Sequence, residues 1–151
     1  MKLGLANGIK LVRNVTIAAR GVTKVDFSNT VNIGDEGPGG GIIFFVRSDN
    51  WYMECSREDL GRVNWDQAIT IARNYRGGRF TDWRLPDKEE LGLMYRNLKV
   101  QGLGGFGNAG YWSSSHYTTS HWWAQWFSDG RQDFTDKNST ESVRAVRSFT
   151  L

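Results

Sequence analysis

The sequence contains one cysteine, Cys55, so an internal disulfide bond is excluded. Stability must therefore come from packing: 39% of the 151 residues are hydrophobic and 13% are aromatic. A chain of this length and composition can fill the core of one domain and is not globally disordered. We expect Cys55 itself to be a small buried hydrophobic residue.

Proline and long apolar runs are also scarce. Only Pro38 and Pro86 occur, against 18 glycines, which predicts many turns with positive φ. The longest apolar run, residues 42–46, is far too short to cross a bilayer, so we expect no membrane insertion. The N-terminus lacks the apolar core of a signal peptide. Either export by a cleaved signal is not used, or that segment is missing from this sequence.

An excess of positive charge is confined to the start of the chain. Residues 1–33 hold five basic residues and one acidic residue, whereas residues 34–151 hold 14 basic and 15 acidic residues. The formal net charge of +3 therefore misrepresents most of the chain. This distribution does not support nucleic-acid binding by the whole domain.

Residues 1–33 are predicted to be a short β arm for oligomerisation or attachment. Its alternating apolar residues are Ile9, Leu11, Val15 and Ile17. Arg20-Gly21 favours a turn, and Val25 with Phe27 favours a second strand. Because a lone hairpin is marginal in water, the arm needs a partner, either the following domain or identical arms of other subunits.

Two strands and two helices are predicted in the first part of residues 34–151. Strands are expected at residues 42–46 and 51–54, after a glycine-rich loop that lacks the Lys-Ser/Thr of a phosphate-binding loop. Asn64 can cap a helix from residue 65 to about residue 75, ended by two glycines. Asp87 and Glu90 form a capping-box pattern for a second helix. Its apolar stripe, interpreted as core, consists of Leu91, Met94, Tyr95 and Leu98.

The C-terminal third is predicted to be all β. Residues 111–115 and 143–147 have strand-like patterns, and Asp129-Gly130 is a strong hairpin signal after a strand at residues 122–127. Arg144 is expected, like Arg147, to pair with buried or edge carboxylates.

Alternation along residues 122–127 divides the strand into two faces. One face holds Trp123, Gln125 and Phe127, and the other holds Trp122, Ala124 and Trp126. We assign the first face to the core and expect Trp122 and Trp126 to face solvent, where large aromatics mark interfaces. The alternative is a sheet covered on both sides.

The segment between the predicted strands is rich in aromatic, hydroxyl and acidic residues, which make adaptable contacts at low entropic cost. It is the candidate ligand-binding surface. The candidate residues are His116, Tyr117, Thr118, Thr119, Ser120, His121, Trp122, Ala124, Trp126, Ser128, Arg131, Asp133 and Phe134.

Catalytic, metal and nucleotide sites are less well supported. No nucleophile-elbow pattern surrounds the serines at residues 113–115, which we expect to bind backbone groups. His116 and His121, with Asp129 or Asp133, match no closed metal site. Residues 102–107 match G-x-G-x-x-G, but they follow a predicted helix and none follows them. We therefore expect no catalytic residue, no metal and no cofactor.

Five segments, in order, resemble one known family. They are Gly34-Asp-Glu-Gly-Pro-Gly-Gly-Gly-Ile-Ile-Phe, Asp82-Trp-Arg-Leu-Pro, Glu89-Glu-Leu, Tyr111-Trp-Ser-Ser-Ser and Val143-Arg-Ala-Val-Arg. Together they resemble the C-terminal domain of Legionella collagen-like adhesins and of many bacterial and phage proteins. The resemblance covers residues 34–149 and implies an α+β, C-type-lectin-like domain with two helices and a small mixed sheet. The predicted domain therefore spans residues 34–151, after the arm.

The resemblance also implies what kind of molecule this is. Formylglycine-generating enzymes of the same superfamily use paired cysteines, which this chain lacks, so we expect no enzyme. The Glu-Pro-Asn, Gln-Pro-Asp and Trp-Asn-Asp motifs of calcium-dependent lectins are missing too. The superfamily includes targets of diversity-generating retroelements, and residues 116–134 lie where their varying residues would be.

We therefore expect a calcium-independent adhesion module that binds a protein or glycan ligand on a host or neighbouring cell. It would be displayed on a phage virion or a bacterial cell surface. By analogy with the family, its arm predicts a homotrimer. The alternatives are an adhesin for sulfated polysaccharide, which would use the basic arm and Arg131, and an active hydrolase or the relic of a formylglycine-type enzyme.

Overall fold

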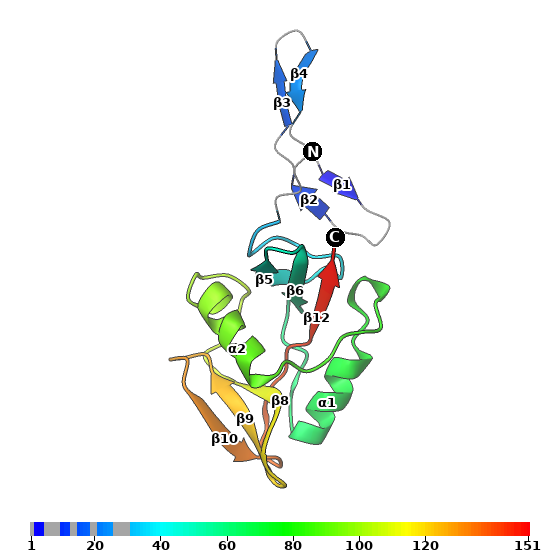
Figure 1. The fold of residues 1–151 in the computed structure, drawn as a ribbon. Coiled ribbons are helices and arrows are strands. Elements are labelled where there is room, and N and C mark those ends of the chain that lie inside the picture. Colours follow the sequence, from blue (N-terminus) through cyan, green and yellow to red (C-terminus); the bar gives the residue numbers. More distant parts are fainter. Residues whose placement is uncertain (1, 5–9, 13–14, 19–20, 26–30) are drawn as a thin grey trace.

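The computed structural model describes residues 2–4, 10–12, 15–18, 21–25 and 31–151 (Figure 1). In the arm, β1 (Lys2–Gly4) pairs antiparallel with β2 (Lys10–Val12), and β3 (Val15–Ala18) pairs antiparallel with β4 (Gly21–Val25). The predictions made for Ile9, Arg20 and Phe27 lie outside the described residues.

A three-stranded antiparallel sheet lies at the end of the domain that carries the C-terminus (Figure 1). Its order is β12-β6-β5, from β5 (Ile42–Arg47), β6 (Trp51–Cys55) and β12 (Val146–Thr150). The turn between β5 and β6 places Asn50 at φ 61°, a conformation that asparagine tolerates. Cys55 on β6 is buried as expected, and burial raises the pKa of its thiol to about 12.

A second, mixed sheet has the order β10-β9-β8-β11-β7. Its strands are β7 (Arg62–Val63), β8 (Gly110–Thr118), β9 (His121–Trp126), β10 (Gln132–Asp136) and β11 (Glu141–Ser142). Only the β11–β8 pair is parallel. The Asp-Gly hairpin is confirmed between β9 and β10, with Gly130 at φ 83°.

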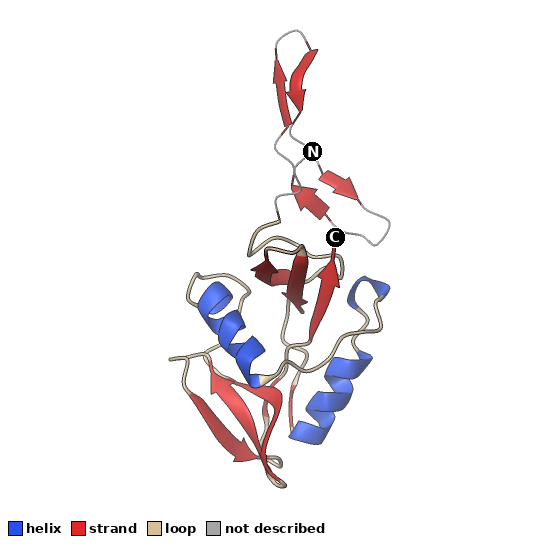
Figure 2. Cartoon of the chain, in the orientation of Figure 1, coloured by secondary structure: helices blue, strands red, loops and turns tan. Residues whose placement is uncertain are grey.

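Two capped helices flank this sheet, as Figure 2 shows. Helix α1 (Trp65–Asn74) begins at Asn64, and α2 (Lys88–Met94) begins at Asp87. Both predicted caps are confirmed, since each N-cap side chain accepts a hydrogen bond from the N3 backbone in a full capping box. A 3-10 turn, η1 (Gly77–Arg79), follows α1, and a π-helical turn, η2 (Tyr95–Lys99), continues α2.

The five-stranded sheet separates two apolar cores, one under each helix. Neighbouring residues of a strand point to opposite faces, and β8 uses this directly. Tyr111 belongs to the core under α2, whereas Trp112 belongs to the core under α1. Both rings are fully buried.

The predicted strand at residues 143–147 is wrong for its first three residues. The chain leaves the five-stranded sheet after Ser142 and joins the three-stranded sheet at Val146, so it is irregular in between. Other segments satisfy its backbone: Leu60 N donates to Val143 O at 2.8 Å, and Ala145 N donates to Ser56 Oγ at 3.1 Å. This segment crosses between the sheets, and burial explains its apolar composition.

Arg144 in this crossing and Arg147 in β12 pair with carboxylates, as predicted. Arg144 Nε lies 2.6 Å from Asp59 Oδ1. Arg147 contacts the fully buried Glu54 at 2.7 Å and Asp82 at 2.7 Å. Arg144 thus joins the crossing to the loop at Asp59, and Arg147 joins β12 to β6 and to the loop at Asp82.

Candidate ligand-binding surface

The candidate surface lies on β8, β9 and β10, at the end of the domain opposite the C-terminus (Figure 1). Strands β9 and β10 pair regularly, from Gln125 with Gln132 to His121 with Asp136. Cross-strand partners share a face of a sheet. Trp123 and Phe134 are such partners, so they lie on the same face.

Four rings gather on that face, those of Tyr117, His121, Trp123 and Phe134; we call them the aromatic cluster. Tyr117 and Phe134 stack with their centroids 4.1 Å apart and their planes 2° apart. Trp123 meets both rings edge to face, at 5.6 Å and 6.0 Å. Tyr117 is 49% exposed and Phe134 42% exposed. The cluster therefore presents a preformed apolar surface to solvent.

Lys88 places a positive charge against this cluster. Its Nζ lies 3.7 Å from the centroid of the Trp123 ring. The Lys88 backbone is held from two strands, because its N–H donates to Ser115 Oγ at 2.9 Å and its carbonyl accepts from Gln132 Nε2 at 2.8 Å. The ammonium group forms no ion pair with any residue between 31 and 151.

The position of α2 explains why this face of the sheet is buried at Phe127 and only half-buried at Trp123. Phe127 is fully buried in the core under α2, together with Leu91 and Met94 of that helix. Trp123 lies nearer the start of β9 and is half-buried, with the first residue of the helix, Lys88, over its ring. The prediction that Phe127 is core is confirmed, and the prediction that Trp123 is core is wrong.

Polar residues of the β8–β9 turn border the aromatic cluster. Thr118 and Thr119 are exposed, and Ser120 is half-buried. His121 Nδ1 lies 3.1 Å from Thr118 Oγ1 and 2.9 Å from Ser120 Oγ. Its ring meets Phe134 edge to face at 5.8 Å. These groups add hydrogen-bonding capacity beside an apolar surface.

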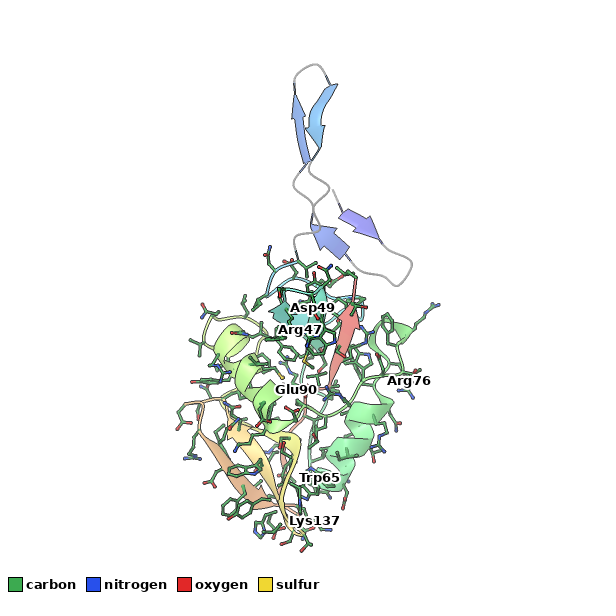
Figure 3. The ribbon with its side chains drawn as sticks, in the orientation of Figure 1. Arg47, Asp49, Trp65, Arg76, Glu90 and Lys137 are labelled. Carbon is green, nitrogen blue, oxygen red and sulfur yellow. The ribbon has the colours of Figure 1, made fainter. Side chains whose placement is uncertain are left out.

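The opposite face of the sheet is partly covered by the start of α1. Trp122 stacks on Trp65 with centroids 3.6 Å apart, and the exposed His116 ring lies 5.0 Å from Trp122. Trp65 is anchored twice: its backbone N–H donates to Lys137 O, a neighbour in Figure 3, and its Nε1 donates to Ser113 O, both at 3.0 Å. The expectation that Trp122 faces solvent is therefore wrong.

Other candidate residues divide between surface and core. Ala124 is 1% exposed in the core under α1, so its assignment to the ligand surface is wrong. Trp126 is half-buried against the same core, with the Arg131 guanidinium 4.8 Å from its ring. Ser128 and Asp133 are exposed. The alternative prediction, a sheet covered on both sides, therefore holds for the part of β9 that contains Ala124 and Trp126.

Three features of the surface were missed by sequence reasoning. Trp123 could have been found, because the Asp-Gly hairpin pairs it with Phe134, a residue already assigned to the surface. Lys88 and Trp65 had no such signal, since each reaches the sheet from the first position of a helix distant in sequence.

Two serines of β8, Ser113 and Ser115, form hydrogen bonds with backbone groups, as expected. Ser113 Oγ donates to Trp123 O at 2.5 Å, and Ser115 Oγ accepts the Lys88 N–H. Within the described part of the chain, no three His, Cys, Asp or Glu side chains gather as a metal site. Residues 102–107 form a loop, with Gly102 at φ 74° and Gly104 at φ 86°.

A cavity of about 440 Å³ lies outside this surface, lined in part by Arg57, Asp59 and Arg144. Its central groups bind one another. The Tyr111 hydroxyl donates to Asp59 Oδ1 at 2.8 Å, next to the Asp59–Arg144 pair. Burial, with this hydrogen bond, raises the pKa of Tyr111 well above its ordinary value. We interpret this network as structural.

The fold is that of a C-type-lectin-like domain, with two helices, a three-stranded sheet and a five-stranded mixed sheet. The family model of the Lcl C-terminal domain, the C-terminal domain of the Legionella collagen-like protein, matches residues 48–147. The chain belongs to this family, which is associated with adhesins. No curated protein matches the chain. Among the helices of the described residues, none is long and apolar enough to cross a membrane.

Proposed function

We propose that this domain is a non-enzymatic adhesion module that binds a protein or glycan ligand on its aromatic cluster. The observation that supports this most directly is the exposed stack of Tyr117 and Phe134, closed on one side by Trp123. Rings held in place by their neighbours lose little entropy on binding, so their contact area contributes efficiently to affinity.

The hydroxyl-rich turn and the outward residues of the hairpin complete the proposed surface. Thr118 and Thr119 border the cluster at the β8–β9 turn, and the exposed Asp136 pairs with His121 on the same face of the hairpin. Such a polar rim around an aromatic centre is typical of recognition surfaces. The family's association with adhesins supports a surface location for the module.

The test is binding of the full chain to glycan and protein arrays, followed by Tyr117→Ala and Phe134→Ala variants. We expect each variant to lose at least about tenfold in affinity for any ligand found, because both remove a central aromatic contact. Arg76→Ala, an exposed residue beyond α1 (Figure 3), is the control and should bind as the parent does. Unchanged affinity in both aromatic variants would exclude the cluster as the site.

A sulfated polysaccharide is the second candidate ligand, favoured by the ammonium of Lys88, which lies over the Trp123 ring. Exposed charge pairs are screened by salt, so retention on heparin should fall steeply between about 0.05 M and 0.5 M salt. Lys88→Gln should reduce this retention further. Retention that is indifferent to salt would argue against the polysaccharide.

A further inference from the structure

Strand β10 forms an open edge of the five-stranded sheet, directly beside the aromatic cluster. Two backbone bonds at its ends establish which groups face outward. Trp126 N donates to Arg131 O at 2.9 Å, and Lys137 N donates to a carbonyl of β9's preceding turn, Ser120 O, at 2.8 Å. In an antiparallel ladder, such bonded pairs recur at every second residue.

The backbone groups of Asp133 and Thr135 therefore face β9. Those of Gln132, Phe134 and Asp136 alternate with them and point away from the sheet. Since β10 is the last strand of its sheet, no further strand among the described residues receives these outward groups. The edge thus offers donors and acceptors at the spacing of an extended chain.

One of the outward donors, the backbone N–H of Phe134, is already hydrogen-bonded to a side chain. The backbone N–H of Phe134 donates to Oδ1 of Asp133 at 2.8 Å, and Asp133 is an exposed side chain. An acceptor on a neighbouring exposed side chain satisfies the donor while the edge is free. The Asp133 side chain can rotate away when a backbone carbonyl of an added strand takes its place. Natural proteins protect edge strands by devices of this kind.

We infer that β10 binds an extended peptide segment of a protein ligand by strand addition. The occupant would pair its backbone with the outward groups of Gln132 and Phe134 and with the N–H of Asp136, whose carbonyl already accepts from Ser139 N at 2.9 Å. It would place an apolar side chain beside Phe134, which is large and 42% exposed at the middle of the edge. Backbone pairing combined with an aromatic contact for alternate side chains is how sheet edges recognise peptides. This inference rests on the proposed function, of which it names the ligand class.

The probe is a display library of random linear peptides, panned against the full chain. Selected peptides should shift the backbone amide resonances of Gln132, Phe134 and Asp136 more than those of α1. Asp136→Pro removes one outward N–H and is compatible with an edge strand. We expect it to weaken peptide binding by about tenfold, whereas Asp136→Ala, which keeps that N–H, should weaken it by less than about twofold.

Asp133→Ala gives a prediction of opposite sign. It removes the side chain that competes for the Phe134 N–H, so peptide binding should tighten by about twofold or more. Failure of the library to yield any peptide, or equal binding by Asp136→Pro and Asp136→Ala, would overturn the inference. Self-association that disappears in Asp136→Pro would show a second copy as the occupant, and would overturn it as well.

These outcomes are separable from those of the proposed function. An array ligand that is lost in Tyr117→Ala but not in Asp136→Pro supports the aromatic site and excludes strand addition. Peptide binding that is lost in Asp136→Pro and weakened in Phe134→Ala, but unchanged in Tyr117→Ala, supports the edge and excludes the Tyr117–Phe134 stack as the binding site.

Discussion

Trp123 and Phe134 face each other across the β9–β10 hairpin, and their rings meet edge to face at 86° with centroids 6.0 Å apart. This pairing places a tryptophan that alternation alone assigned to the core beside a ring at the surface. The two faces of one strand therefore carry different aromatic environments. Trp123 belongs to the exposed aromatic cluster, and Trp122 belongs to a stack with Trp65.

The two environments predict different effects of mutation. Trp122→Ala should lower the free energy of unfolding by about 3 kcal/mol, because it removes a half-buried ring that stacks at 3.6 Å on Trp65. Tyr117→Ala should lower it by less than about 1 kcal/mol, since that ring is largely at the surface. Urea denaturation followed by circular dichroism measures both. Similar losses in the two variants would contradict this assignment of faces.

The buried ion pair between Arg147 and Glu54 predicts a large loss on removal of one partner. Arg147→Met would leave the fully buried Glu54 carboxylate without its cation, at a cost of about 3–5 kcal/mol. Two backbone N–H groups, of Gly39 and Gly41, would still bind this carboxylate. The double variant Arg147→Met with Glu54→Gln should recover part of the loss. Denaturant unfolding of all three proteins gives the coupling energy, and simple additivity would contradict a buried pair.

Replacing Gly130 in the β9–β10 turn should destabilise the domain in two ways, through backbone strain and through a steric clash. Its φ is 83°, and a Cβ there would lie 2.5 Å from Cε2 of Tyr95. Gly130→Ala should therefore destabilise the domain by about 2 kcal/mol or more. Gly102→Ala is the matched control, because its φ of 74° is similar and no atom lies within 4 Å of the added Cβ. Thermal melts of the two variants separate the contributions, and equal shifts would exclude a clash with Tyr95.

Glu141 on β11 predicts a dependence of stability on pH. Burial raises the pKa of this carboxyl above its ordinary value, opposed by Arg62. The stability that its retained proton contributes is fully present below the ordinary Glu pKa. It is lost as the pH rises through the raised pKa, because the unfolded chain has already released the proton. Glu141→Gln stays neutral, so its stability relative to the parent should increase over this pH range.

The measurement for Glu141 is urea unfolding of parent and variant at intervals from pH 3.5 to pH 7.5. Glu58→Gln, at an exposed position, is the control for removal of one surface charge. A difference between Glu141→Gln and its parent that stays constant, or that falls with rising pH, would contradict the raised pKa.

Much of the local structure was predictable from short-range signals. Asn64 and Asp87 cap the two helices, Asp129-Gly130 turns the hairpin, and the buried arginines pair with carboxylates. Each of these depends on residues close in sequence, or on the high cost of burying an unpaired charge. The family motifs carried the fold class, which the match over residues 48–147 confirms.

The division of the strands between two sheets was not predictable in this way. Residues 143–147 look like one strand, because the crossing part and the strand part are both buried and both combine apolar residues with a paired arginine. Whether such a run stays in one sheet depends on distant partners such as Leu60 and Ser56, which satisfy its backbone. The composition of a segment indicates that it is buried, but it does not indicate which strand it pairs with.

The sequence by itself determined the capped helices, the hairpin and the high aromatic content of residues 111–134. Only the tertiary structure decided which aromatic rings face solvent. Helix α2 begins at Lys88 and leaves the ring of Trp123 beside exposed neighbours, whereas α1 begins at Trp65 and covers Trp122. Alternation separates the two faces of a strand, but the cover on each face comes from helices remote in sequence. The extent of that cover, in turn, depends on where each helix starts over the sheet.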